Sequence, residues 1–374
     1  MKDNIEQSRR KFLQSSAVGA ATLPLVMMGR TYAAEPKRDD ADIPDPIRAL
    51  KPVTNAVPIK DSEYEQRLNK AQRLMADNKL DAIFMAGGTS LEYFVDVDWW
   101  VSERTAGVLL PRTGDPIYIT PAFEKSRALE QIRFGHDIRT WQEYESPYEK
   151  IAQILHDKHI STGRIGIEER VPFFIANGIG DAAPHAHLVS ATPVTAGCRG
   201  VKSEAELALM QIANDATLAV YHAVWQSLEP GMTQQQVSDL VQKAYAQQGL
   251  NGFASVNVGK YTAQPHGSRE PQHIVEGTVV MLDDGCKVEG YTSDITRTFV
   301  LGKATDKMKK VFAIVQKAQI AAREAARTGN RMEDIDAAAR KVIADSGFGP
   351  GYKYFTHRLG HGIGMDMHEW YYAV

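Results

Sequence analysis

Cysteine is scarce in this 374-residue chain, which has only Cys198 and Cys286. Two thiols exclude the disulfide framework that supports small secreted domains. A single bridge between them stays open from the sequence, and we predict that both are unpaired. Excess charge of one sign is also lacking, since the formal net charge is -3. This balance gives no overall field to attract nucleic acid or an anionic membrane surface.

Long apolar runs are lacking as well. The N-terminal apolar stretch 15–28 is interrupted by Gly19 and Pro24 and is shorter than the ~20 residues that a spanning helix needs. It follows Ser8-Arg9-Arg10-Lys11-Phe12-Leu13-Gln14, which closely resembles the twin-arginine export signal. We predict that residues 1–34 are a signal peptide and that the mature protein is periplasmic. An uncleaved membrane anchor is the alternative.

The remaining chain is predicted to consist of an arm and two domains. Residues 35–60 are rich in proline and charge and show no apolar period, which indicates an extended linker or arm. Residues 61–197 alternate helical and strand patterns, with Thr113-Gly114-Asp115 as a hairpin turn, and indicate an α/β domain. Residues 198–374 contain two modules, each a long helix, a glycine break and a shorter helix. This layout predicts a pseudo-duplicated α+β domain.

Two helix starts in the second domain carry local signals. Ser203 is followed three residues later by Glu206, a capping box that predicts a helix to about residue 228. Thr233 opens the next helix, predicted to run to about residue 248. A later helix over 305–327 places apolar residues at positions 308, 311, 312 and 315, the spacing of one helix face.

The stretch 279–299 carries carboxylates where a strand of the core would not have them. An apolar, β-branched run leads into Asp283 and Asp284, a glycine bend follows, and Asp294 lies near the start of a second Thr-rich strand. This pattern predicts a hairpin. Buried carboxylates need a counter-charge, and mutual repulsion makes a purely structural Asp283–Asp294 pair improbable. A metal ion is the sharper interpretation, and capping by Arg297 is the simpler one.

Three histidines fall within twelve residues near the end of the chain. They are His357, His361 and His368, and glycines flank His361 on both sides. Glycine lets the backbone approach closely, and imidazole is a common metal ligand. The aspartate pair and the glycine-flanked His361 give three candidate ligands, and a set dominated by carboxylates favours Mn, Mg or Co over Cu or structural Zn.

From about residue 64 onward the chain resembles the pita-bread metallopeptidases of family M24, and most closely the Xaa-Pro branch with its extra creatinase-like N-terminal domain. Several motifs carry the resemblance in order and spacing. They are Pro265-His266-Gly267, Asp283-x-Gly285, Ser293-Asp294-Ile295-Thr296-Arg297-Thr298, Gly360-His361-Gly362-Ile363-Gly364 and His368-Glu369-Trp370. The resemblance implies an α+β fold in which a creatinase-like α/β domain precedes a pita-bread catalytic domain.

The resemblance also implies roles for individual residues. Asp283, Asp294 and His361 would ligate two divalent metal ions, most simply Mn, with Co or Zn as alternatives. His266 and His368 would be catalytic, the first at the scissile amide nitrogen and the second at the developing oxyanion. His357 would line the pocket for the proline ring.

The implied enzyme is an exopeptidase that removes an N-terminal residue before proline from short peptides, as an aminopeptidase or a dipeptidase. A homodimer is implied for the family. The family has two further glutamate ligands, in an Asn-Glu-Pro-Gly-like segment and a Leu-Glu-Asp-like strand, and residues 1–374 contain neither. We therefore expect a C-terminally truncated form that lacks strands of the catalytic sheet and has uncertain activity. A metal-dependent hydrolase or lyase that is not a peptidase, and a non-catalytic remnant, are the alternatives.

Overall fold

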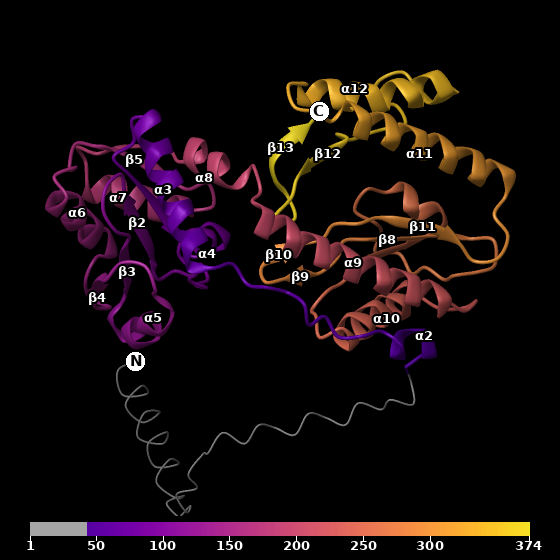
Figure 1. Cartoon of the computed structure of the whole chain (residues 1–374), viewed down its shortest axis with the longest axis horizontal. Helices are drawn as coiled ribbons and strands as arrows, with labels where there is room; N and C mark the ends of the chain where they lie inside the picture. The colour runs from indigo at the N-terminus through magenta and orange to yellow at the C-terminus, as the bar shows by residue number, and fades with distance from the viewer. Residues whose placement is uncertain (1–42) are drawn as a thin grey trace, which may run out of the picture. The chain divides into compact units, whose positions relative to one another are not determined.

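The computed structural model describes residues 43–374 (Figure 1). By its internal contacts, Pro44–Val374 forms one unit. The predicted signal peptide, residues 1–34, lies outside the described residues. Within the described part of the chain, no helix has both the length and the apolar character that crossing a bilayer requires.

The predicted arm, residues 35–60, is described from residue 43 onward. It contains one short helix, α2 (Asp45–Arg48), and then runs without regular structure to residue 60. The Ile47 side chain is fully buried, and α2 packs against helices α9 (Glu204–Gln226) and α10 (Gln234–Gln247). The Val53 amide also donates a hydrogen bond of 2.9 Å to the Gln248 carbonyl. The arm is thus fixed to these two helices by an apolar side chain and a backbone bond.

The first sheet has six strands in the order β4-β3-β2-β1-β5-β6. Strand β2 is antiparallel to both of its neighbours, and the remaining pairs are parallel. The antiparallel step is the predicted hairpin, whose turn places Gly114 at a φ of 93°. The strands are β1 (Ala82–Ala86), β2 (Gly107–Pro111), β3 (Ile117–Pro121), β4 (Asp137–Trp141), β5 (Arg164–Ile167) and β6 (His187–Ser190).

Helices connect and flank these strands, as the alternating sequence pattern predicts. Apolar residues of the sheet, including Phe84 and Ile119, pack with Ile151 and Ile179 from two of the helices in one buried core. The helices are α3 (Asp61–Asp77), α4 (Thr89–Val95), α5 (Lys125–Gln131), α6 (Pro147–Asp157), α7 (Phe173–Ala182) and α8 (Thr192–Arg199), with a 3-10 turn η2 (Ala122–Glu124) before α5.

Both predicted capping signals are confirmed at the start of α9 and α10. The Ser203 hydroxyl accepts from the Glu206 amide at 3.2 Å, and the Glu206 carboxylate accepts from the Ser203 amide at 2.7 Å. At α10 the Thr233 hydroxyl accepts from the Gln236 amide at 3.1 Å, and the Gln236 side chain completes the box. These bonds satisfy donors that the first turn of a helix leaves free.

Replacing Thr233 with alanine is expected to lower the free energy of unfolding by about 1 kcal/mol, because it removes the cap of α10. Urea denaturation followed by circular dichroism measures this change. Gln235 lies two residues further on and is exposed, and its side chain bonds only to Asp239 within the same helix. Gln235→Ala is the matched control and should change the free energy by less than about 0.5 kcal/mol. Equal effects would contradict the capping role.

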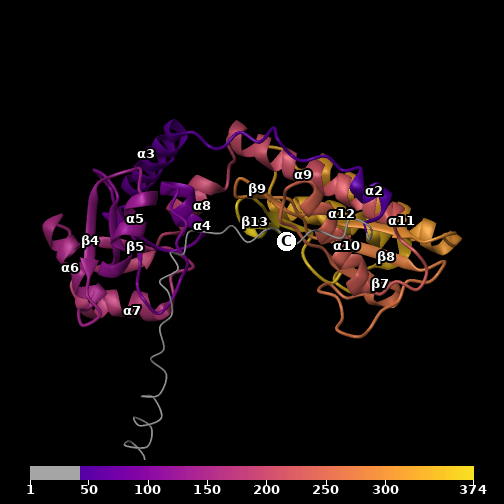
Figure 2. The same ribbon diagram turned by 90° about the horizontal axis from the view of Figure 1, so that it is seen from below.

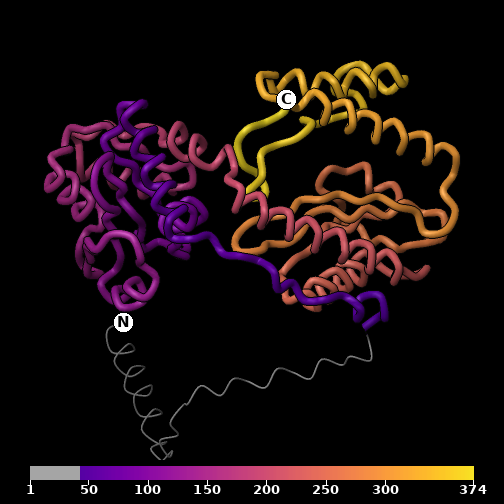
Figure 3. The backbone as a smooth tube through the Cα atoms, in the orientation of Figure 1, coloured from indigo at the N-terminus to yellow at the C-terminus, as the bar shows by residue number. Residues whose placement is uncertain are grey.

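The predicted hairpin 279–299 is confirmed, with an insertion. Strand β8 (Val279–Asp283) pairs antiparallel with β11 (Arg297–Val300), and β7 (Ser255–Val258) lies on the other side of β8. Between β8 and β11 the chain forms a second, two-stranded ribbon of β9 (Lys287–Val288) and β10 (Tyr291–Thr292). Figure 3 traces β8 and β11 as neighbouring strands. A 3-10 turn, η3 (Gly259–Ala263), follows β7.

The C-terminal part consists of two helices and a two-stranded ribbon. Helices α11 (Asp306–Ala325) and α12 (Met332–Ile343) pack on each other, and a short π-helical turn η4 (Ala344–Phe348) extends α12 (Figure 2). Strands β12 (Gly360–Gly362) and β13 (Glu369–Ala373) pair antiparallel. The helix over 305–327 is confirmed, but its apolar face is open: Phe312 is 55% exposed, whereas Ala318 and Ala322 are buried against α12.

Candidate metal centre

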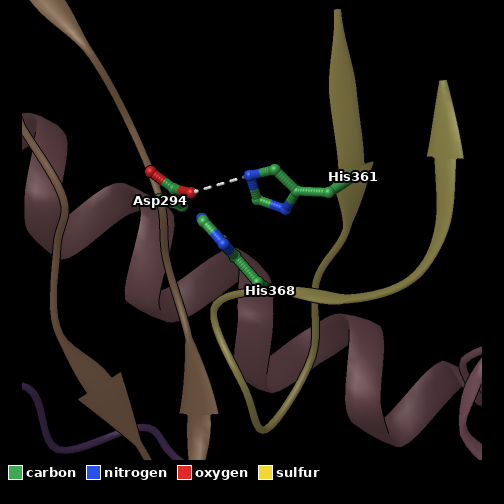
Figure 4. A group of neighbouring side chains, drawn as sticks. All are labelled: Asp294, His361 and His368. Carbon is green, nitrogen blue, oxygen red and sulfur yellow. Dashed lines mark ion pairs between the residues drawn. The ribbon is translucent and has the colours of Figure 1, made fainter. Parts of the chain in front are cut away.

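Three side chains from separate segments converge at one point, namely Asp294, His361 and His368 (Figure 4). One ligand atom from each lies within 4.8 Å of the others. The Asp294 carboxylate lies 3.5 Å from His361 Nε2. The two imidazole rings are 4.0 Å apart between centroids. In the described part of the chain, these residues form the one group of at least three His, Cys, Asp or Glu side chains that are close enough together to hold a metal ion.

His361 owes its orientation to the bend in β12. The register of the β12–β13 ribbon shifts between His361 and Gly362, and a Cβ atom at Gly362 would lie only 1.7 Å from the Trp370 carbonyl oxygen. Only glycine fits at that contact. His361 Nδ1 donates a hydrogen bond of 2.9 Å to the Gly362 carbonyl, which leaves the Nε2 lone pair facing Asp294. A backbone acceptor on the far nitrogen is how proteins fix a metal-ligating histidine.

His368 lies on the loop that joins β12 to β13, and its side chain is exposed. Partial desolvation is the main cause that lowers the pKa of its imidazole, and the neighbouring His361 lowers that pKa further. The lowered pKa favours the neutral imidazole, the form that has a free lone pair. His368 is therefore able to ligate a metal ion or to donate one hydrogen bond to a substrate.

Asp294 precedes β11 and is half-buried. Burial is the largest cause that raises the pKa of this carboxyl, and the negative charge of Asp283 raises it further, while His361 and His368 lower it. The raised pKa means that the ionised carboxylate lacks a sufficient counter-charge in its surroundings. A bound cation would supply that counter-charge.

The donor set fits a divalent ion. One carboxylate and two imidazoles are ligands that Zn, Mn and Co accept. Ligand atoms about 2.1 Å from a tetrahedral ion lie about 3.4 Å apart, close to the separation of Asp294 from His361. The three residues thus provide a set of ligands that is already converged.

Asp283 is the last residue of β8, and the structure does not include it in the group of three. The sequence interpretation placed Asp283 beside Asp294 on paired strands. Instead, the pairing of Arg297 with Leu282 brings Asp283 next to Thr296, whose hydroxyl donates to its carboxylate. Asp283 is still near enough for its charge to raise the pKa of Asp294. Its assignment as a metal ligand stays a prediction.

Asp284, the residue after Asp283, also lies outside the group of three. Its backbone has a φ of 111°, and its carboxylate accepts a hydrogen bond of 3.1 Å from the Ser255 amide. Burial raises the pKa of this carboxyl to about 6, and Asp283 and Asp294 contribute to the rise. The side chain is thus directed to the β7 backbone.

The simpler interpretation of the aspartates was that Arg297 caps them. In the structure the Arg297 guanidinium instead donates a hydrogen bond to the Thr296 carbonyl.

The other two predicted site histidines are exposed. His266 follows η3, and its charge contributes to lowering the pKa of His368, which places the two imidazoles in the same neighbourhood. His357 donates from Nδ1 to the Arg358 carbonyl at 2.7 Å and stacks edge-on with Phe355. Neither belongs to the group of three. Their predicted roles therefore depend on the resemblance of the motifs.

Comparison with known proteins assigns the two domains of this chain to known families. The model for metallopeptidase family M24 matches residues 208–374, and the model for the creatinase/prolidase N-terminal domain matches residues 67–201. An uncharacterized peptidase of Schizosaccharomyces pombe is 32% identical over 347 residues, covering 87% of this chain and 75% of the relative. An Xaa-Pro dipeptidase of Lactobacillus delbrueckii subsp. lactis is 29% identical, covering 81% and 83%.

A solved structure of a peptidase has the same fold as this chain. The dipeptidase PepE from Mycobacterium ulcerans superposes with a TM-score of 0.78 at 28% identity, covering 85% of each chain. The predicted fold, a creatinase-like α/β domain followed by a pita-bread catalytic domain, is confirmed by these matches. Both cysteines are free and buried, as predicted. By its two family matches and its 32% identity to a peptidase, the chain belongs to metallopeptidase family M24.

Proposed function

We propose that this metallopeptidase cleaves the bond before proline in short peptides and releases the N-terminal residue. The observation that carries the proposal is the convergence of Asp294, His361 and His368, which come from the motifs shared with the Xaa-Pro branch. The similarity to an Xaa-Pro dipeptidase supports the choice of substrate. The bond before proline is a tertiary amide without an N–H group, so peptidases that bind this hydrogen do not accept it.

Each residue has a proposed part in the reaction. Divalent ions, when bound, activate a water molecule and polarise the scissile carbonyl. Asp294 and His361 would hold an ion, and Asp283 would supply a further carboxylate if a second ion binds. His368 donates a hydrogen bond to the carbonyl oxygen as negative charge develops there. His266 contacts the amide nitrogen, and His357 lines the pocket for the proline ring.

We propose Mn²⁺ as the native ion, because two of the three proposed ligands, Asp283 and Asp294, are carboxylates, which suit this ion.

Hydrolysis of Ala-Pro and Gly-Pro tests the proposal. The metal-free polypeptide is assayed for released proline alone and with increasing Mn²⁺, and the His361→Ala variant is the matched control. We expect Mn²⁺-dependent release of proline that the variant loses, because it lacks an ion ligand. Ala-Ala should be a poorer substrate, since it lacks the proline ring.

The remaining outcomes point to other functions. Metal binding with no hydrolysis of any dipeptide would favour a metal-dependent hydrolase or lyase of another kind. Neither metal binding nor turnover in a well-folded polypeptide would show a non-catalytic remnant and would overturn the proposal.

A further inference from the structure

The loop that carries His368 is held at two points by a single arginine. Residues 363–368 connect β12 to β13. Asp366 in this loop and Glu369, the first residue of β13, both bind the guanidinium of Arg199, the last residue of α8. The Arg199–Asp366 bond is 2.7 Å and the Arg199–Glu369 bond is 2.5 Å. His368 lies between the two anchored residues.

The anchor is buried. The side chains of Arg199 and Glu369 are each 2% exposed, so both charges have been removed from water. Arg199 also donates to the Ser90 hydroxyl at 3.0 Å, which in turn donates to Glu168. A second cation, Lys202, lies 2.8 Å from the other oxygen of Glu369. In such an environment a charged hydrogen bond is strong, and a missing partner is costly.

The backbone of this loop is restricted by further contacts besides those with Arg199. A Cβ atom at Gly364 would lie 2.7 Å from the Glu369 carboxylate, so the turn closes directly onto the bound side chain. The Gly364 carbonyl accepts from the Thr292 amide at 2.8 Å and from its hydroxyl at 2.7 Å. The Asp366 amide donates a hydrogen bond of 3.3 Å to the Glu369 carboxylate. The backbone that leads to His368 is therefore defined by contacts on both sides.

We propose that Arg199 is a positioning residue for His368. By binding Asp366 and Glu369 together, it holds the loop in the conformation that brings the imidazole to Asp294 and His361. Arg199 bonds to Ser90, Asp366 and Glu369 and not to any of these three residues, so it acts through the loop. The consequence for peptide cleavage rests on the proposed function, whereas the consequence for loop order and metal binding does not.

The experiment compares Arg199→Met with Arg170→Met in the full chain. Arg170 also binds Asp366, at 2.8 Å, but its side chain is 56% exposed, which makes it a matched control. Two quantities are measured without any substrate: hydrogen exchange of the peptide covering residues 363–370, and the affinity and visible spectrum of bound Co²⁺. The loop leads directly out of β12, which carries the proposed ligand His361. We therefore expect faster exchange and a 10–100-fold loss of Co²⁺ affinity in Arg199→Met, the range for partners behind a ligand. Arg170→Met should stay close to the parent protein.

A double variant separates positioning from stability. Arg199→Met leaves the Glu369 carboxylate buried with only Lys202 beside it, which lowers the melting temperature. Adding Glu369→Gln removes that charge and should restore much of the melting temperature, while Co²⁺ affinity and the altered spectrum stay changed. The proposal would be overturned if the double variant recovered the Co²⁺ affinity together with the melting temperature, or if Arg199→Met kept a parent-like Co²⁺ spectrum. Either result would leave Arg199 and Glu369 as a purely structural ion pair.

The proposed function fails in a different way. If no dipeptide is hydrolysed but Arg199→Met still loosens the loop and weakens Co²⁺ binding, the positioning role stands without the peptidase. If hydrolysis is found and Arg199→Met does not change kcat, exchange or Co²⁺ binding, the peptidase stands without the positioning role.

Discussion

Replacing Asp294 with asparagine is expected to lower the affinity for Mn²⁺ by more than 100-fold. Loss of a partner behind a ligand typically costs 10–100-fold, and Asp294 is the carboxylate in the group itself. Asparagine keeps the shape but removes the charge that attracts the ion. Isothermal titration of the metal-free polypeptide measures the change. Because the folded protein loses a carboxyl whose pKa is raised by burial, its stability without metal should not fall.

Matched variants test which residues belong to the metal centre. His357→Ala changes an imidazole that lies outside the group and bonds to the Arg358 carbonyl, so the Mn²⁺ affinity should stay within a few-fold of the parent value. Asp283→Asn decides between one ion and two. A dinuclear centre that uses Asp283 loses one ion per chain, whereas a site built from the group of three keeps its stoichiometry. An Asp294→Asn variant with parent-like affinity would show that the metal lies elsewhere.

The features that the sequence predicted well are governed by neighbours in the chain. The capping box of Ser203 and Glu206 needs only residues three apart, and it forms as expected. The turn at Gly114 joins two adjacent strands whose pairing follows from the turn. His361 was identified because glycines on both sides permit a backbone bend, and that bend is present.

The features that the sequence did not predict depend on contacts between distant segments. The pairing of Leu282 with Arg297 brings Asp283 to Thr296, where Asp294 was expected. The apolar spacing of α11 predicted the helix correctly, but spacing alone does not show which partner covers a face, and Phe312 stays exposed. The two ends of the Arg199–Glu369 pair are 170 residues apart. No local pattern marks such a pair.

Replacing Arg67 with methionine is expected to lower the free energy of unfolding by about 3–5 kcal/mol, the cost of removing one partner of a buried ion pair. Arg67 is 4% exposed and joins α3 to α9 and β10. Its guanidinium donates to the Tyr93 carbonyl at 2.9 Å and to the Tyr291 hydroxyl at 2.8 Å. The Glu206 carboxylate lies 3.6 Å away and is 3% exposed. Without Arg67, that carboxylate is buried without its cation.

Urea denaturation of three variants measures this effect. Arg112→Met is the control, because Arg112 pairs with Asp81 at 3.3 Å but is 46% exposed, and such pairs contribute at most about 1 kcal/mol. The double variant Arg67→Met with Glu206→Gln should be more stable than the sum of the single losses predicts, since it removes the unpaired charge together with its partner. Strictly additive losses would show that Arg67 does not stabilise the protein through Glu206. Its packing on Tyr93, whose ring centroid is 4.1 Å from the guanidinium carbon, and its 3.0 Å bond to Glu63 would then account for the effect.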